Sequence, residues 1–282
     1  MSVQVVTLEL RRWLDEQARA GLADEAIVAA MVATGWQRGV ANAAVAEVRR
    51  QARGAAPPAA APAPKPMPEP ALAGSAHLLR AGGREVQVLA TLAKPRVVVF
   101  GALLDAQECD DLVELARSRL ARSETITPAT GGSEINAART SEGMFFARGE
   151  NALIGAIEAR IAELLRWPVE RGEGIQVLRY APGAEYKPHY DYFDPAQPGT
   201  PGILRRGGQR VGSLVMYLNN PVRGGGTSFP DVGLEVAPAR GNAVFFSYER
   251  PDPDTLSLHG GAPVVEGEKW VATKWLREGR FD

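Results

Sequence analysis

The sequence is poor in cysteine and has no long apolar run. Cys109 is the single cysteine, so no disulfide can form within the chain, and this composition is typical of a reducing compartment. No apolar stretch approaches the ~20 residues that a membrane-spanning helix needs. Residues 1–16 also lack the basic start and apolar centre of a secretory signal. We therefore expect a cytoplasmic protein that does not bind a membrane.

Neither sign of charge is in excess. The chain carries 32 basic and 33 acidic side chains, which gives a net charge of −1. Proteins that bind nucleic acid usually carry a basic patch and a high isoelectric point, so this balance gives no support for a nucleic-acid partner. Hydrophobic residues make up 45% of the chain, which is ordinary for a soluble globular protein, and 282 residues suffice for one or two domains.

Residues 1–53 predict a small module of three helices. Apolar residues recur at helical spacing over 8–14, 24–33 and 40–53. Gly35 is typical of the position just beyond the C-terminus of a helix. Two roles remain open for this module. It either docks a protein partner or serves as an appendage that only adds stability.

Residues 54–75 are rich in alanine and proline. Prolines at this density block helix and sheet and favour an extended polyproline II conformation. We interpret the segment as a semi-rigid spacer, in preference to a ligand for a proline-binding partner or a self-substrate. The second domain then covers residues 76–282.

Histidine is also scarce, with only His77, His189 and His259 in the chain. His189 and Asp191 are two positions apart, and residues with this spacing on a β-strand point to the same face. They would supply two ligands of the 2-His-1-carboxylate triad, which binds Fe(II) and leaves positions open for oxygen and substrate. His259 is the candidate third ligand, because two distant strands that close on one pocket would bring it there.

Lys269 follows His259 inside an apolar strand. Strand alternation places Lys269, Val271, Thr273 and Trp275 on one face, and the intervening residues on the other. A lysine that points into an apolar pocket needs an anionic partner, because an unpaired buried charge is costly. The end carboxylate of a keto acid bound to the metal would be such a partner.

Five segments, in order, resemble the catalytic domain of the prolyl 4-hydroxylase family of Fe(II)/2-oxoglutarate dioxygenases, in its bacterial type. The resemblance covers about 95–277. The segments are R-T-S-E-G-M-F from Arg139, G-E-G-I-Q-V-L-R-Y from Gly172, G-A-E-Y-K-P-H-Y-D from Gly183, G-G-G-T-S-F-P from Gly224, and the run from His259 to Trp275.

The resemblance implies a complete set of cofactors and site residues. Fe(II) would be bound by His189, Asp191 and His259, with 2-oxoglutarate and O2 as cosubstrates and ascorbate as reductant. Lys269 would bind the far carboxylate of 2-oxoglutarate, with help from Tyr180, and Thr227 would face the cosubstrate. Residues that match substrate-contacting positions of the family are Arg139, Ser141, Glu173, Tyr186, Arg210 and Trp275. The family has a glutamate at the position of Gly226.

Short strands separated by Gly/Pro turns follow Ile175 and indicate an α+β fold with a jelly roll. This agrees with the double-stranded β-helix that the resemblance implies, with helices packed outside it. Asp105 and Glu108 form the pattern of a capping box, which predicts a helix start. The connection at 191–210 is longer than a hairpin needs, and such loops are often functional lids.

Three functions are compatible with these observations. The first is procollagen-proline 4-dioxygenase-like hydroxylation of a peptidyl proline with release of succinate and CO2, which Tyr186, Arg139 and Arg210 together favour. The second is a 2-oxoglutarate oxygenase that acts on a different side chain or on a small molecule. The third is a non-catalytic module that binds proline-rich peptides.

Overall fold

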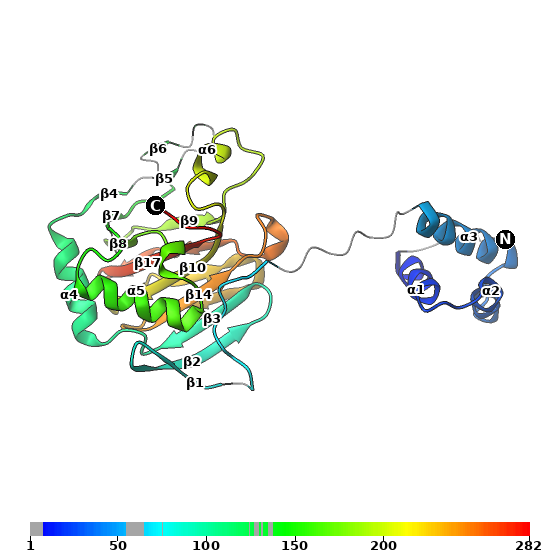
Figure 1. Ribbon diagram of the computed structural model, residues 1–282, viewed down its shortest axis with the longest axis horizontal. Coiled ribbons are helices and arrows are strands. Elements are labelled where there is room, and N and C mark those ends of the chain that lie inside the picture. Colours follow the sequence, from blue (N-terminus) through cyan, green and yellow to red (C-terminus); the bar gives the residue numbers. More distant parts are fainter. Residues whose placement is uncertain are drawn as a thin grey trace. The chain divides into compact units, whose positions relative to one another are not determined.

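The chain forms two compact units in this computed structural model, Met1–Lys65 and Pro66–Asp282. The structure describes residues 8–54, 65–74, 76–123, 125–126, 130, 132–134 and 138–282. Figure 1 labels helices and strands of both units. None of the described helices is long and apolar enough to cross a membrane.

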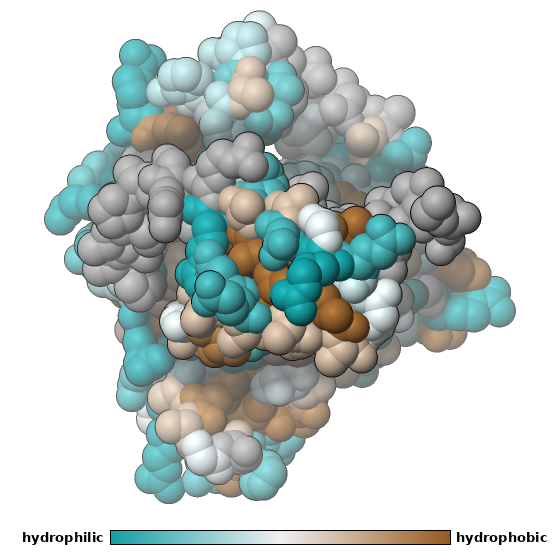
Figure 2. All heavy atoms as spheres, turned by 90° about the vertical axis from the view of Figure 1, so that its right-hand side faces the viewer, coloured by the Kyte–Doolittle hydropathy of each residue, from teal (hydrophilic) through white to brown (hydrophobic). Residues whose placement is uncertain are grey.

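The first unit is built from helices that share one small core. The helices are α1 (Leu8–Arg19), α2 (Asp24–Ala33) and α3 (Arg38–Gly54). Buried side chains of that core include Leu14, Ile27, Met31 and Val45. Gly35 lies just beyond α2 with a φ of 95°, a conformation that glycine adopts without strain. Figure 2 shows polar side chains over much of the visible surface, with apolar side chains in patches between them.

The predicted spacer ends before residue 75. Residues 55–64 and 75 lie outside the described residues, but 66–74 belong to the second unit. The backbone N–H of Glu69 donates to the carbonyl of Leu165 at 2.9 Å, and Met67 and Leu72 pack against the core of that unit. The second unit therefore begins at Pro66, before the domain boundary predicted at residue 76. Dense prolines predict an extended backbone, but not whether that backbone lies against a domain.

The second unit is organised around a large antiparallel sheet. In the described residues this sheet has nine strands, in the order β1-β2-β3-β14-β10-β17-β8-β7-β4. They are β1 (Leu78–Ala81), β2 (Arg84–Leu92), β3 (Arg96–Gly101), β14 (Ala243–Ser247), β10 (Arg210–Tyr217), β17 (Lys269–Arg277), β8 (Ile175–Tyr180), β7 (Glu142–Phe146) and β4 (Ala121–Arg122).

A smaller antiparallel sheet has the order β13-β12-β15-β9. Its strands are β13 (Leu234–Val236), β12 (Thr227–Phe229), β15 (His259–Gly261) and β9 (Tyr186–His189). Two short pairs complete the strands, β11 (Arg223–Gly224) with β16 (Val264–Glu266) and β5 (Thr125–Ile126) with β6 (Ser133–Glu134). Single 3-10 turns occur at η1 (Val169–Arg171), η2 (Pro230–Val232) and η3 (Pro253–Thr255).

The two sheets face each other across an apolar core. Tyr217 and Val271 contribute to this core from the large sheet, and Phe229 and Val236 contribute from the small one. Two facing antiparallel sheets are consistent with the predicted jelly roll. Because side chains alternate along each strand, the opposite face of the large sheet is left for the helices.

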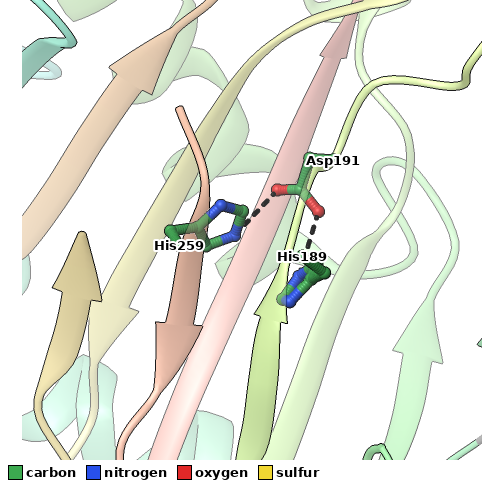
Figure 3. Close-up of side chains that lie close together, drawn as sticks. All are labelled: His189, Asp191 and His259. Carbon is green, nitrogen blue, oxygen red and sulfur yellow. Dashed lines mark ion pairs between the residues drawn. The ribbon is translucent and has the colours of Figure 1, made fainter. Parts of the chain in front are cut away.

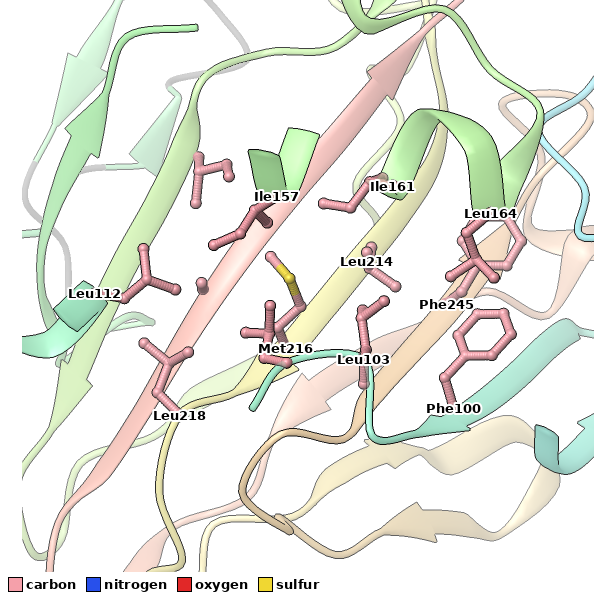
Figure 4. Packing of buried hydrophobic residues seen from close by; sticks show 14 of the residues in the cluster. Phe100, Leu103, Leu112, Ile157, Ile161, Leu164, Leu214, Met216, Leu218 and Phe245 are labelled. Carbon is pink, nitrogen blue, oxygen red and sulfur yellow. The ribbon is translucent and has the colours of Figure 1, made fainter. Parts of the chain in front are cut away.

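Helices α4 (Ala106–Arg117) and α5 (Ala152–Leu165) cover that opposite face. Figure 4 shows Ile157 and Ile161 of α5 pointing toward Leu214 and Met216 of β10. The predicted capping box is present: the Asp105 side chain accepts from Glu108 N–H, and the Glu108 side chain accepts from Asp105 N–H. The helices therefore pack outside the barrel, as predicted. A further short helix, α6 (Thr200–Leu204), lies in the long connection at 191–210.

Candidate active site

The two candidate histidine ligands come from neighbouring strands of the small sheet. His189 ends β9 and His259 begins β15, and these two residues are directly opposite each other in the antiparallel ladder. Residues opposite each other in such a ladder project to the same face with Cβ atoms ~5 Å apart. The ladder thus brings together two side chains that are far apart in sequence (Figure 3).

Asp191 completes a cluster that could hold a divalent metal. His189 Nε2 lies 3.6 Å from Asp191 Oδ1, and His259 Nε2 lies 3.5 Å from Asp191 Oδ2. One ligand atom from each of the three residues lies within 4.8 Å of the other two. The donor set of two imidazoles and one carboxylate on one side is that of the facial triad.

Both imidazoles are oriented through their Nδ1 atoms. His189 Nδ1 lies 2.9 Å from the carbonyl of Lys187, and His259 Nδ1 lies 3.0 Å from the carbonyl of Ser257. A carbonyl only accepts, so each Nδ1 donates a proton to it, and each ring turns its Nε2 toward Asp191. Burial lowers the pKa of His259 to about 4, so its ring is neutral at pH 7, the form that binds metals.

Asp191 is oriented by a hydrogen bond from a residue that sequence analysis missed. Its side chain is buried, and Ser213 donates to its Oδ2 at 2.6 Å. The Ser213 hydroxyl also lies 3.0 Å from the phenol of Tyr248. Burial alone would raise the pKa of Asp191, but the neighbouring imidazoles and Arg210 hold it well below its usual range. The only signal in the sequence was a small polar residue on the inward face of an apolar strand.

A narrow cavity runs from the cluster to Lys269. The cavity is lined by His189, Asp191, His259, Tyr180, Thr227, Lys269, Val271, Thr273 and Trp275, among others. The last four belong to the face of β17 that strand alternation predicted, while Trp270, Ala272 and Leu276 pack in the core on the other face. The predicted alternation of β17 is therefore confirmed.

Lys269 is the cation at the inner end of this cavity. It is 3% exposed, and no hydrogen bond or ion pair joins its Nζ to another residue in the described part of the chain. Nζ lies 5.3 Å from the ring centroid of Tyr180, which is opposite Lys269 in the β17–β8 ladder. Burial lowers the pKa of Lys269 to about 8, although the Glu235 carboxylate opposes this shift. Lys274, by contrast, donates to Glu158 on α5 at 2.5 Å and points away from the site.

A wider groove of about 750 Å³ adjoins the narrow cavity at the cluster. It is lined by Arg139, Glu173, Tyr186, Arg210 and Trp275, five of the six residues predicted to contact substrate. Tyr186 stacks on His189 at 3.6 Å between ring centroids, and the Arg139 guanidinium lies over the Tyr186 ring, 4.9 Å from its centroid. Tyr190, Tyr192 and Phe193 add further rings that sequence analysis missed.

Two substrate predictions change when the contacts are known. Ser141 is fully buried, donates to Ser123 at 2.9 Å, and lines neither cavity, so these contacts give no support to its predicted role in substrate binding. Glu173 and Arg210 bind each other through two hydrogen bonds of 2.6 and 2.9 Å. This ion pair raises the pKa of Arg210 against the opposing effect of its burial, so the pair forms a fixed wall of the groove.

The side chain of Glu235 explains why residue 226 is glycine here and not the glutamate of the family. A Cβ at residue 226 would lie 2.1 Å from Oε1 of Glu235, which is on the adjacent strand β13. The Glu235 carboxylate thus occupies the space that a side chain at 226 would need. A negative charge is present at this turn, but it comes from a different strand.

Comparison with known proteins agrees with this geometry. The family model of the 2OG-Fe(II) oxygenase superfamily matches residues 175–277. Prolyl 4-hydroxylase 1 of Arabidopsis thaliana is 41% identical over 220 residues, which cover 72% of this chain and 75% of the relative. Probable prolyl 4-hydroxylase 4 of the same plant is 39% identical over 213 residues, 67% of this chain and 70% of the relative.

Among solved structures, the viral collagen prolyl hydroxylase vCPH from Paramecium Bursaria Chlorella virus-1, in its 2OG complex, aligns with a TM-score of 0.49 and 31% identity. That alignment covers 64% of this chain and 95% of the viral chain. The plant relatives are similar over most of their length, and the family model spans the strands that carry the cluster. The chain therefore belongs to the prolyl 4-hydroxylase family of the 2-oxoglutarate- and Fe(II)-dependent oxygenases.

Proposed function

We propose that the protein hydroxylates a peptidyl proline, with 2-oxoglutarate and O2 as cosubstrates and succinate and CO2 as coproducts. Its plant relatives are named prolyl 4-hydroxylases. The observation that carries the proposal is the position of the cluster where the two cavities meet: His189 and Asp191 line both cavities, and His259 lines the narrow one. One cavity leads to a buried cation, and the other opens as a groove lined by aromatic rings.

The three ligands fit Fe(II). Two imidazoles, of which the buried His259 is neutral at pH 7, and one buried carboxylate supply the donors that non-haem Fe(II) takes. Ser213 and the two backbone carbonyls fix the orientation of the ligands. Bound Fe(II) would supply the activation of O2, which no protein side chain provides.

The residues of the narrow cavity fit a keto acid with a second carboxylate. Lys269 offers an ammonium group that makes no hydrogen bond or ion pair in the described part of the chain, and Thr227 and Tyr180 line the same cavity. A charge-assisted hydrogen bond to the far carboxylate would hold 2-oxoglutarate by that end and direct its keto-acid end toward the cluster. The apolar residues Val215 and Val271 would exclude water between the two ends.

The groove fits an extended peptide that contains proline. The ring of Tyr186, stacked on His189, offers an apolar surface next to the cluster, where a proline ring would pack. Arg139 and Trp275 line both cavities, and the Glu173–Arg210 pair lines the groove. Rings of this kind are the usual contacts of polyproline II segments.

Two finer points belong to the same proposal. Ascorbate would act as the reductant that keeps the metal ferrous. The protein would work in the cytoplasm, which is supported by the lone thiol of Cys109, buried in the core and without a disulfide. The helical unit at its N-terminal end would dock a protein partner.

The decisive experiment incubates a proline-containing peptide with the protein, Fe(II), 2-oxoglutarate and ascorbate, and reads the peptide by mass spectrometry. We expect a mass gain of one oxygen on proline and an equal amount of succinate. Oxygen on another residue would favour the second function, a different 2-oxoglutarate oxygenase. If no succinate forms with any peptide, the third function, a binding module, replaces the proposal.

The affinity for 2-oxoglutarate should fall as pH rises above about 8. Free Lys269 loses its proton near this pH because its pKa is lowered to about 8, whereas a bound carboxylate keeps the ammonium protonated. Binding then takes up a proton, and the KM for 2-oxoglutarate should rise by up to ~10-fold per pH unit. The measurement is KM from pH 6.5 to 9.5. Lys269→Arg, which stays charged, should flatten the profile, and an equally flat wild-type profile would contradict the assignment.

A further inference from the structure

Tyr217 is a buried phenol that joins the two sheets behind the narrow cavity. It lies on β10 of the large sheet and is fully buried. Its Oη donates to Oγ1 of Thr227, on β12 of the small sheet, at 2.7 Å. Thr227 is 3% exposed and lines the cavity that leads to Lys269. Tyr217 therefore contacts the cavity wall but lies one side chain behind it.

The direction of this hydrogen bond determines where the Thr227 proton points. Burial raises the pKa of Tyr217, so the phenol keeps its single proton at neutral pH. The other acceptor within reach, the carbonyl of Val236, is 3.4 Å away, beyond the usual O–H···O range. The phenol proton therefore lies on Thr227 Oγ1, and the proton of Thr227 must go to a different acceptor.

The inner end of the cavity offers donors to whatever enters it. In the described part of the chain, no residue accepts a hydrogen bond from Thr227 Oγ1 or from Lys269 Nζ. Both groups line the same cavity, one as a neutral O–H and the other as an ammonium. An ionised carboxylate only accepts hydrogen bonds and has room for several, so it matches these two donors.

We propose that Tyr217 is a positioning residue for the cosubstrate, which acts by holding the Thr227 hydroxyl with its proton directed at the far carboxylate of 2-oxoglutarate. The inference rests on the proposed function, because it takes 2-oxoglutarate as the occupant of this cavity. Without the phenol, the Thr227 hydroxyl can rotate and donate elsewhere. The hydroxyl then donates to the cosubstrate in only a fraction of its orientations, so it contributes less to cosubstrate binding.

The expected effects are on the affinity for 2-oxoglutarate. Thr227→Val removes a hydrogen bond to a charged group and should weaken 2-oxoglutarate binding by ~10-fold or more. Tyr217→Phe leaves the threonine in place and should weaken it by a smaller factor, roughly 3- to 10-fold.

Binding is measured by titration calorimetry of 2-oxoglutarate into the full chain loaded with Mn(II), so that the readout does not depend on turnover. The variants are Tyr217→Phe, Thr227→Val and the double variant. Ser228→Ala is the matched control, because it removes a hydroxyl from the next residue of β12 that does not line the cavity. Thermal unfolding without 2-oxoglutarate checks that each variant is folded.

A double-mutant comparison separates positioning from general damage. If Tyr217 acts through Thr227, the double variant binds 2-oxoglutarate no more weakly than Thr227→Val alone, and Ser228→Ala binds like the wild type. The inference is overturned if Tyr217→Phe binds like the wild type, or if its loss adds in full to that of Thr227→Val. Failure of the wild type to bind 2-oxoglutarate at all would instead overturn the proposed function.

Discussion

Asp191→Ala should abolish hydroxylation and coupled succinate release. The Asp191 carboxylate is the anion that both ligand imidazoles approach, at 3.6 and 3.5 Å. Loss of a residue that merely orients a metal ligand already costs ~10- to 100-fold in metal affinity or activity, so loss of the ligand itself should exceed ~100-fold. The variant also leaves Arg210 without one of its two anionic neighbours, although Glu173 keeps that guanidinium paired.

The measurement pairs metal affinity, from competition with a chelator, with succinate formation. Asp191→Asn is the isosteric companion that separates loss of charge from loss of volume, and it should be nearly as inactive. Ser213→Ala keeps the carboxylate but removes its 2.6 Å donor, so its metal affinity should fall only within the smaller range. Normal coupled hydroxylation by Asp191→Ala would refute the triad.

The sequence pointed to His189 and Asp191 through their two-residue spacing, although β9 ends at His189 and Asp191 lies in the loop that follows. Lys269 and Trp275 do follow strand alternation along β17. The spacing could not predict the pairing itself. That His259 lies directly opposite His189 follows from the register of β9 and β15, which the turns and the core set together. Ser213 was missed because it reaches Asp191 from β10 of the large sheet, a contact that depends on how the two sheets pack together, and Tyr248 was missed because it contacts Ser213.

The sequence provided less information about residues whose environment is set by side chains distant in the chain. Proline content predicted an extended segment at 66–74, yet the apolar side chains of Met67 and Leu72 bind that segment to the second unit. Ser141 matched a substrate position by sequence, but its hydroxyl is directed at Ser123. The position of Glu235 against Gly226 is a cross-strand contact that no local pattern reports. Local backbone geometry, such as strand alternation, can be predicted from the sequence. Contacts between residues on different strands depend on the whole fold.

Lys269→Ala should raise the KM for 2-oxoglutarate steeply while metal binding is retained. Truncation of one partner of a buried charge pair costs ~2–5 kcal/mol, and each ~1.4 kcal/mol is a factor of ten, so the expected rise is from ~30-fold to more than 1,000-fold. Lys269 is 3% exposed and projects from β17 into the cavity, whereas the metal ligands come from the small sheet and the loop after it. The cosubstrate site and the metal site should therefore separate in this variant.

The experiment measures succinate formation against 2-oxoglutarate concentration, and metal affinity in parallel. Lys94→Ala removes an exposed lysine that lines neither cavity, and it serves as the charge control. Lys269→Arg keeps the charge but not the size, so it should recover part of the affinity, and added alkylammonium ions should restore some activity to Lys269→Ala. An unchanged dependence on 2-oxoglutarate would place the anchor elsewhere. Lys274 could not take over, because Glu158 already neutralises its ammonium on the far side of the sheet.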